Sequence, residues 1–218
     1  MPVKSTARFK LFPKETFQPN NDDDPLPYYY KPLLRILYQY RIQQGLSLLS
    51  PPYETVLEFG YGSGLLLPTL ATISSKLYGI DIASDSPTVM SCLNKINISA
   101  TLYQNDLLKM NFKDNIFDLI VAFSVFEHIH DCRKILQKMF HILKPNGRLL
   151  VGMPRVDKNM VRLFSLIGYD TIEQHHVTDY KSFLNDCRGY FILEKQAKLF
   201  PFLPSCLGLY FNMLLKKA

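Results

Sequence analysis

The chain has 218 residues, enough for one domain with extended ends, and its 47% hydrophobic and 20% charged residues are ordinary for a globular protein. This composition excludes a disordered chain, a collagen and a coiled coil. The net charge of +6 lies at the two ends, because residues 1–18 carry +3 and residues 187–218 carry +4, whereas the 168 residues between them sum to −1. We therefore expect a near-neutral body with basic termini that suit an anionic partner.

Residues 1–27 are polar and contain Pro13, Pro19, Pro25 and Pro27 and three consecutive aspartates, a composition typical of a flexible N-terminal arm. No apolar run in the first twenty residues could form the core of a signal peptide. The four cysteines lie far apart and lack metal-ligand spacing, so we expect reduced thiols, no metal site and a cytoplasmic protein. Residues 28–218 are predicted to form a single domain. It begins with a helical cap at 28–52, where apolar residues recur every three or four positions.

Short β-branched or aromatic runs then alternate with helical stretches. The predicted strands are 55–59, 76–81, 100–104, 117–123 and 148–152, and the predicted helices are 65–74, 86–95 and 132–143. This alternation indicates βαβ units in a Rossmann-like, doubly wound α/β fold with a mostly parallel sheet. Pro145 and Gly147 are expected to end the third of these helices in a tight turn.

Beyond residue 152 the alternation loosens. We expect helices at 157–167 and 179–187, and a segment at 153–178 that covers the substrate. Two further strands, 190–195 and 209–215, are predicted to form an antiparallel hairpin at the sheet edge, which makes seven strands in all.

The strongest functional signal is a predicted strand that runs into a loop with Gly60, Gly62 and Gly64. Glycines at alternating positions let the backbone turn sharply and approach a ligand closely. Such a loop after the first strand of an α/β sheet is where nucleotide-like ligands bind. A dinucleotide-binding loop needs a small residue three positions after its second glycine. This chain has Leu65 there, which leaves an NAD(P)-binding oxidoreductase as the weaker alternative.

Three further motifs accompany the loop. Glu58 stands two residues before the first glycine, the second strand ends in Tyr78-Gly79-Ile80-Asp81, and the third ends before Asn105-Asp106-Leu107. With residues 117–129 and 143–150, this pattern resembles the class I S-adenosylmethionine-dependent methyltransferases, within the type 11 group of ubiquinone- and menaquinone-methyltransferase-like proteins. The resemblance covers about residues 56–154.

The resemblance implies S-adenosylmethionine as the cofactor and suggests its contacts. It assigns Glu58, Gly60, Gly62 and Gly64 to the methionine half, Asp81 to the ribose hydroxyls and Ile82 to the adenine ring. In the run Asn105-Asp106-Leu107, which also belongs to the expected cofactor site, it places the acid against the adenine amino group. A carboxylate suits a diol because it offers only acceptors. Further candidates for the cofactor site are Tyr29, Tyr61, Phe123 and Ser124.

Methyl transfer requires a positioned acceptor that can lose its proton. His128, just after the fourth strand, is suited to proton removal near neutral pH. His175 and His176 are the other candidate bases. The alternative interpretation of all three is structural, because the Glu-His-Ile run accompanies varied substrates in the resembled group and Thr178 and Asp179 can open an ordinary helix.

The acceptor is expected to be a small molecule, such as a lipid, a sugar or a natural-product scaffold, methylated at oxygen. The chain lacks the Asn/Asp-Pro-Pro-Tyr turn and the Pro-Cys nucleophile of nucleic-acid and glutamine methylation, and its body is neutral, so no nucleic-acid partner is expected. The apolar segment 199–215 is predicted to be the last strand; the alternative is an apolar rim that meets an anionic membrane through Lys216 and Lys217. A non-catalytic cofactor-binding interaction protein is the remaining hypothesis.

Overall fold

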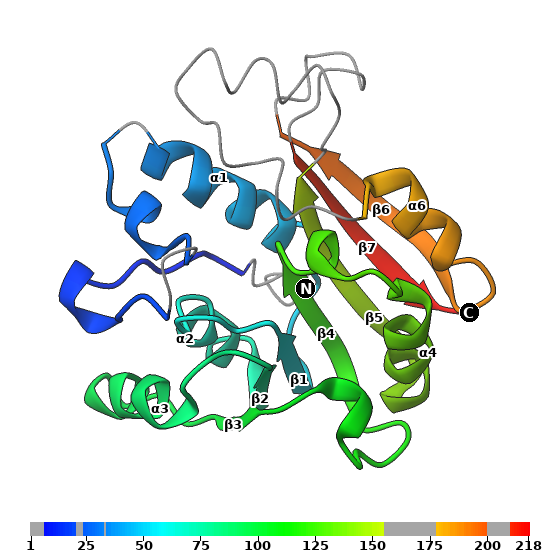
Figure 1. The fold of residues 1–218 in the computed structure, drawn as a ribbon, viewed down its shortest axis with the longest axis horizontal. Coiled ribbons are helices and arrows are strands. Elements are labelled where there is room, and N and C mark those ends of the chain that lie inside the picture. The colour runs from blue at the N-terminus through cyan, green and yellow to red at the C-terminus, as the bar shows by residue number, and fades with distance from the viewer. Residues whose placement is uncertain (1–6, 21–23, 33, 155–177, 200–209) are drawn as a thin grey trace, which may run out of the picture.

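The computed structural model describes residues 7–20, 24–32, 34–154, 178–199 and 210–218 (Figure 1). Seven strands form one sheet in the order β3-β2-β1-β4-β5-β7-β6. They are β1 (Tyr53–Phe59), β2 (Ser74–Asp81), β3 (Thr101–Gln104), β4 (Phe117–Phe123), β5 (Leu143–Pro154), β6 (Phe191–Lys198) and β7 (Tyr210–Lys217). The described α-helices are α1 (Leu34–Leu46), α2 (Leu67–Ala71), α3 (Ser86–Lys95), α4 (Cys132–Ile142) and α6 (Tyr180–Asp186).

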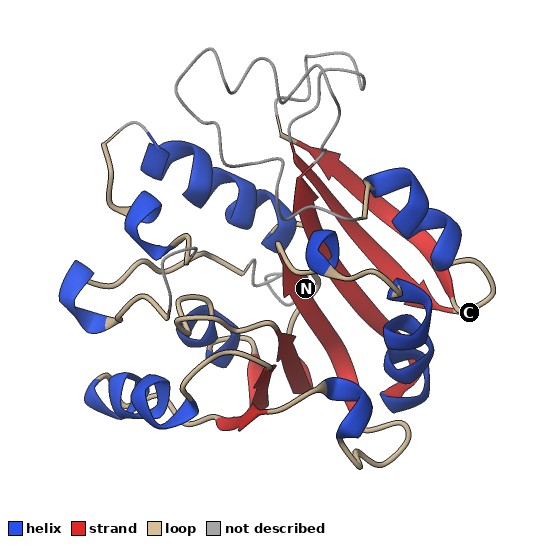
Figure 2. Cartoon of the chain, in the orientation of Figure 1, coloured by secondary structure: helices blue, strands red, loops and turns tan. Residues whose placement is uncertain are grey.

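Strands β1 to β5 pair in parallel, whereas β7 pairs antiparallel with both β5 and β6. Helices lie on both sides of the sheet (Figure 2), so the central strands are buried on both faces and read as continuous apolar runs. In β4, Leu119 and Val121 pack with α1, α2 and α3, while Ile120 and Ala122 pack with α4 and α6. The period-2 alternation of a strand thus divides the interior into two cores.

The predicted fold class is confirmed: a Rossmann-like, mostly parallel seven-stranded sheet with a C-terminal antiparallel pair. The predicted bounds of the helix at 86–95 and the strand at 117–123 match α3 and β4. The helical stretch at 65–74 is shorter than predicted, because β2 begins at Ser74, where it pairs with Tyr53. The predicted helix at 157–167 lies outside the described residues.

The turn predicted at 144–147 is an irregularity inside β5 instead. Phe117 pairs with Leu143, and the register then shifts so that Leu119 pairs with Arg148. The left-handed residue is Asn146, with φ 63°, and not Gly147. Asn tolerates this conformation better than most residues with a side chain.

The segment predicted to be a flexible arm is packed against the body over its described part. Phe9 N donates to Gln43 Oε1 (2.8 Å) on α1, and Lys10 N donates to Thr69 Oγ1 (2.9 Å) on α2. Phe17 and Leu26 are only 2% and 3% exposed. A few apolar side chains spaced along a polar segment are sufficient to dock the segment on the domain. The average composition of the segment does not reveal them. The covering segment and the domain boundaries stay predictions.

Described residues 210–217 of the apolar C-terminal segment form an interior strand, β7, as its first interpretation predicts. Phe211, Met213 and Leu215 are at most 3% exposed, and Lys217 Nζ donates to Leu143 O (2.6 Å). This part of the chain therefore has no apolar side chains left for a membrane rim. Within the described residues, no helix has the length and apolar character needed to cross a bilayer. The cytoplasmic location stays a prediction.

Candidate active site

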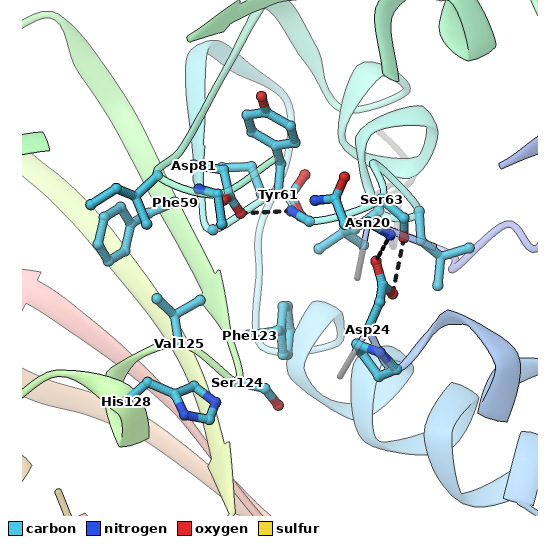
Figure 3. Close-up of a pocket in the computed structure, with 18 of the residues that line it drawn as sticks. Asn20, Asp24, Phe59, Tyr61, Ser63, Asp81, Phe123, Ser124, Val125 and His128 are labelled. Atoms are coloured by element: carbon cyan, nitrogen blue, oxygen red, sulfur yellow. Dashed lines mark hydrogen bonds between the residues drawn. The ribbon is translucent and has the colours of Figure 1, made fainter. Parts of the chain in front are cut away.

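A cavity of about 750 Å³ opens at the carboxyl ends of β1, β2, β3 and β4 (Figure 3). Strands β1 and β4 are neighbours in the sheet, and the strand order reverses between them. At such a reversal the connecting segments diverge to opposite faces of the sheet and leave a crevice, which is where open α/β sheets bind ligands. The N-terminal segment and the inner face of α1 complete the cavity wall.

The three loop glycines serve two different purposes. All three have left-handed φ angles, 77° at Gly60, 51° at Gly62 and 83° at Gly64. A Cβ on Gly60 would collide with Val125, and one on Gly64 would lie 2.5 Å from Val89 Cγ1, so these two glycines permit close packing. A Cβ on Gly62 would meet no atom within 4 Å in the described part of the chain, so this glycine faces open space in the cavity. Gly64 is not among the residues that line the cavity, and its cofactor contact stays a prediction.

Asp81 is the last residue of β2 and is held by three backbone donors. Gly62 N donates to Asp81 Oδ2 (2.9 Å), and Ala83 N (2.8 Å) and Ser84 N (2.9 Å) donate to Oδ1. These hydrogen bonds join the loop after β1 to the loop after β2 and fix the carboxylate at the cavity wall (Figure 3). Its remaining lone pairs can accept hydrogen bonds from a ligand.

Glu58 is a buried acid with an unsatisfied oxygen. Its side chain lines the cavity, the residue is 5% exposed, and Oε2 has no hydrogen-bond partner among the described residues. Burial, and then the negative charge of Asp81, raises the pKa of Glu58 well above its ordinary value. A buried polar atom without a partner costs about 1–3 kcal/mol. The site is therefore arranged to gain free energy when a donor or a cation reaches Glu58.

The loops after β2 and β3 form an apolar rim. Ile82 is 73% exposed and Leu108 is 44% exposed, and both line the cavity. The predicted residues Asn105, Asp106 and Leu107 line it as well. Asp106 also caps the 3₁₀ helix η3 (Leu107–Lys109) by accepting a hydrogen bond from Leu108 N (2.9 Å), so its carboxylate has a structural role in addition to the predicted one.

Two polar residues of the N-terminal segment belong to this site although the sequence reasoning missed them. Asp24 accepts hydrogen bonds from Asn20 N (2.9 Å) and Leu26 N (2.8 Å), and Ser63 Oγ of the glycine loop donates to it (3.4 Å) (Figure 3). Asn20 Nδ2 donates to Ser84 Oγ. The available signal was Asp24-Pro25 just before the 3₁₀ helix η2 (Leu26–Tyr29), because an Asp side chain at such a turn can accept a hydrogen bond from the backbone two residues on.

Arg41 is the other residue that was missed. It lies on the inner face of α1, lines the cavity, and has a buried Nε without a hydrogen-bond partner among the described residues. Its Nη2 donates weakly to Tyr29 OH (3.4 Å), and its guanidinium carbon lies 4.1 Å from the ring centroid of Tyr38 and 5.0 Å from that of Tyr210. Tyr29, a predicted site residue, also lines the cavity, and its hydroxyl helps to position the Arg41 guanidinium.

The turn after β4 contributes the fourth wall, with Phe123, Ser124, Val125 and His128 (Figure 3). Ser124 has a left-handed φ of 56°, and its hydroxyl lies 3.1 Å from Tyr210 OH. His128 is the last residue of the 3₁₀ helix η4 (Phe126–His128). His175 and His176 lie outside the described residues, so their predicted roles stay predictions.

Glu127 lies behind this wall and is 1% exposed. Burial raises its pKa to about 8, although a hydrogen bond from Ser124 and the charge of Arg41 partly oppose the rise. The Oε2 atom of Glu127 has no partner among the described residues.

Tyr61, also predicted at the site, lines the cavity, but its ring packs on Gly79. A Cβ added to Gly79 would lie 2.8 Å from Tyr61 Cδ1. No three His, Cys, Asp or Glu side chains of the described ranges cluster as metal ligands.

The methyltransferase domain family matches residues 34–186, about 70% of the chain. The chain belongs to this family. The resemblance to class I S-adenosylmethionine-dependent methyltransferases is thereby confirmed, S-adenosylmethionine is the cofactor of this domain, and the oxidoreductase alternative is not favoured.

Curated relatives cover methyltransferases of several kinds. Phosphoethanolamine N-methyltransferase 2 of Caenorhabditis elegans is 30% identical over 105 residues, 47% of this chain and 24% of that protein. Ubiquinone biosynthesis O-methyltransferase of Glaesserella parasuis serovar 5 is 28% identical over 155 residues, 68% of this chain and 63% of that protein. The chain spans less than two thirds of the length of these relatives.

Solved structures share the fold. N-methyltransferase NodS from Bradyrhizobium japonicum WM9, in complex with S-adenosyl-L-homocysteine, has a TM-score of 0.65 at 20% identity, with 91% of this chain and 94% of that chain covered. The PH0226 protein from Pyrococcus horikoshii OT3 has a TM-score of 0.69 at 14% identity, with 87% and 94% covered. At these identities the likeness shows the fold alone.

Proposed function

We propose that the protein transfers a methyl group from S-adenosylmethionine to an oxygen atom of a small, largely apolar molecule. The observation that carries the proposal is Glu58 Oε2, a buried oxygen without a partner among the described residues, in the same cavity as Gly62 and Asp81. For a cationic, hydroxyl-rich ligand, Glu58 offers a hydrogen-bond acceptor, Gly62 offers open space beside the backbone, and Asp81 offers a carboxylate held in place.

The residues present fit the cofactor at both of its ends. Glu58 and Arg41 carry opposite charges when ionised, and each has a buried polar atom without a partner among the described residues, which suits the ammonium and carboxylate of a methionine moiety. Asp81 offers acceptors to the ribose hydroxyls, and exposed Ile82 and Leu108 offer apolar surface to the adenine. Gly62 leaves room for close backbone approach because no side chain fills the space.

When bound, the cofactor supplies a methyl group on a sulfonium, which is already activated for displacement. The chain's own residues must then bind and orient the acceptor, exclude water and receive its proton. His128 borders the cavity at the end of η4 and is our candidate for the proton acceptor, with His175 and His176 as further candidates. The choice of oxygen rests on this base, since a hydroxyl must lose a proton as it is methylated.

The acceptor class is inferred from the cavity wall. Phe9, Leu26, Ile42, Phe123 and Ile129 give it a predominantly apolar lining, which favours a lipid or a natural-product scaffold over a sugar. A protein that binds the cofactor without turnover is the competing hypothesis, and nothing in the described site favours it.

Calorimetric titration with S-adenosylmethionine is the first test. We expect binding in the micromolar range or tighter, and a loss of at least tenfold in affinity in Asp81→Ala. Absence of binding at high micromolar concentration, together with no effect of Asp81→Ala, would refute the proposal. Extracts supplied with radiolabelled cofactor then identify the acceptor. Cofactor binding without any labelled product would favour the non-catalytic alternative.

A further inference from the structure

The outer face of α1 carries apolar side chains that the fold leaves uncovered. The inner face is buried through Ile42 and Leu46, yet Ile36 and Tyr40, one turn apart on the opposite side, are 66% and 46% exposed. A surface helix ordinarily presents polar residues to water. Ile36 and Tyr40, with Phe9, Arg35, Gln39 and Gln43, form a groove of about 500 Å³, which we call the α1 groove.

The surroundings of the α1 groove are basic. Arg35 lines it, and Arg8, next to Phe9, is exposed. Among the described residues no acid lines the groove, and the sequence has none between Pro25 and Tyr53, where the exposed residues Lys31 and Arg35 fall. Exposed cations around exposed isoleucine and tyrosine form a surface that complements the anionic headgroups and the apolar boundary of a bilayer.

The α1 groove also adjoins the cofactor cavity. Phe9 lines both hollows, and Arg41 and Ile42 on the inner face of α1 line the cavity. One helix thus separates the outer surface from the proposed site of methyl transfer. A molecule held at the α1 groove would lie one helix diameter, about 10 Å, from the wall of the cavity that α1 forms.

We propose that the α1 groove docks the protein on an anionic lipid membrane, and that its acceptor is an amphiphile carried in that membrane. The acceptor class rests on the proposed function, whereas the docking does not. A nucleic acid would use the cations but would gain little from an exposed isoleucine, so a lipid surface explains both kinds of side chain. Of the predicted C-terminal alternative, the described part, β7, is buried and offers no such surface.

The test is sedimentation of the full chain with vesicles of phosphatidylcholine alone or with added phosphatidylserine. We expect binding that requires the anionic lipid and weakens as salt rises. In Arg8→Glu/Arg35→Glu, partition to anionic vesicles should fall by about 25-fold or more, because each cation near such a surface contributes about fivefold. The matched control Lys95→Glu/Lys113→Glu makes the same change in net charge at exposed positions outside the α1 groove and should retain binding.

A second pair of variants tests the apolar part. Ile36→Ser should weaken vesicle binding, and Ile192→Ser, an equally exposed isoleucine at 61% on the edge strand β6, should not. Equal loss in target and control variants, or equal binding to neutral and anionic vesicles, would overturn the docking proposal. Calorimetry with S-adenosylmethionine on the same variants keeps the two proposals apart. Intact cofactor binding with no vesicle binding refutes only the docking, and the reverse result refutes only the proposed function.

Discussion

Replacing Gly62 with alanine tests the site most directly, because the structure separates its two consequences. The new methyl group would meet no atom of the described residues within 4 Å, so it clashes with none of them. The left-handed φ of 51° makes alanine strained by about 1–2 kcal/mol. For a chain of this size, each kcal/mol lowers Tm by roughly 2–4 °C. The methyl group does, however, occupy the open space of the cavity.

If the cofactor contacts the glycine loop, the alanine methyl group should collide with it. The collision should cost about 1–3 kcal/mol of binding free energy, a loss of roughly 5- to 150-fold in affinity. Titration calorimetry measures the affinity and thermal unfolding measures the stability. Gly189→Ala is the matched control. Gly189 also has a left-handed φ, 87°, and open space around its Cβ position, but it does not line the cavity. Equal cofactor affinity in the two variants would refute the assignment of the glycine loop to the cofactor.

Three further predictions follow from the titratable groups of the site. In Glu58→Gln, the heat of cofactor binding should no longer depend on the ionisation enthalpy of the buffer. In the wild type a cationic ligand should drive a proton from this raised-pKa acid, so a buffer-independent wild-type heat would contradict the role of Glu58. Glu127 keeps its proton up to about pH 8 in the native state but loses it near pH 4.5 when unfolded, so the stability it contributes is present below pH 4.5 and is lost as the pH rises towards 8. Denaturant titrations at pH 5 and pH 8 measure this loss. Between these pH values the free energy of unfolding should fall by up to about 4 kcal/mol more in the wild type than in Glu127→Gln. An equal fall in both proteins would exclude the raised pKa of Glu127. His128→Ala should lower turnover on the identified acceptor by about 100-fold or more while cofactor affinity changes little; unchanged turnover would remove His128 from the mechanism.

Local features of the sequence determined the element order and the position and backbone conformation of the glycine loop. The apolar run 119–122 in β4 is buried on both faces of the parallel sheet, as a continuous apolar run in a central strand predicts. The conformations at Gly60 and Gly62 are left-handed, which their spacing after a strand indicated. Asp81 is found at the cavity because the carboxyl ends of parallel strands meet at one edge of the sheet. Each of these conclusions depends on residues close together in the chain.

The tertiary structure alone decided which side chains of the less regular segments reach the site. Arg41 and Ile36 lie on the same helix, but one lines the cavity and the other is exposed, and a sequence in which apolar residues occur on both faces cannot distinguish the two sides. Asp24 sits in a polar run that suggests a flexible arm, yet Ser63 of the glycine loop donates to it. Gly64, which shares its motif with Gly62, packs on Val89 instead of facing the cavity. In each case the deciding contact joins residues far apart in the chain, and their proximity is set by how the helices dock on the sheet.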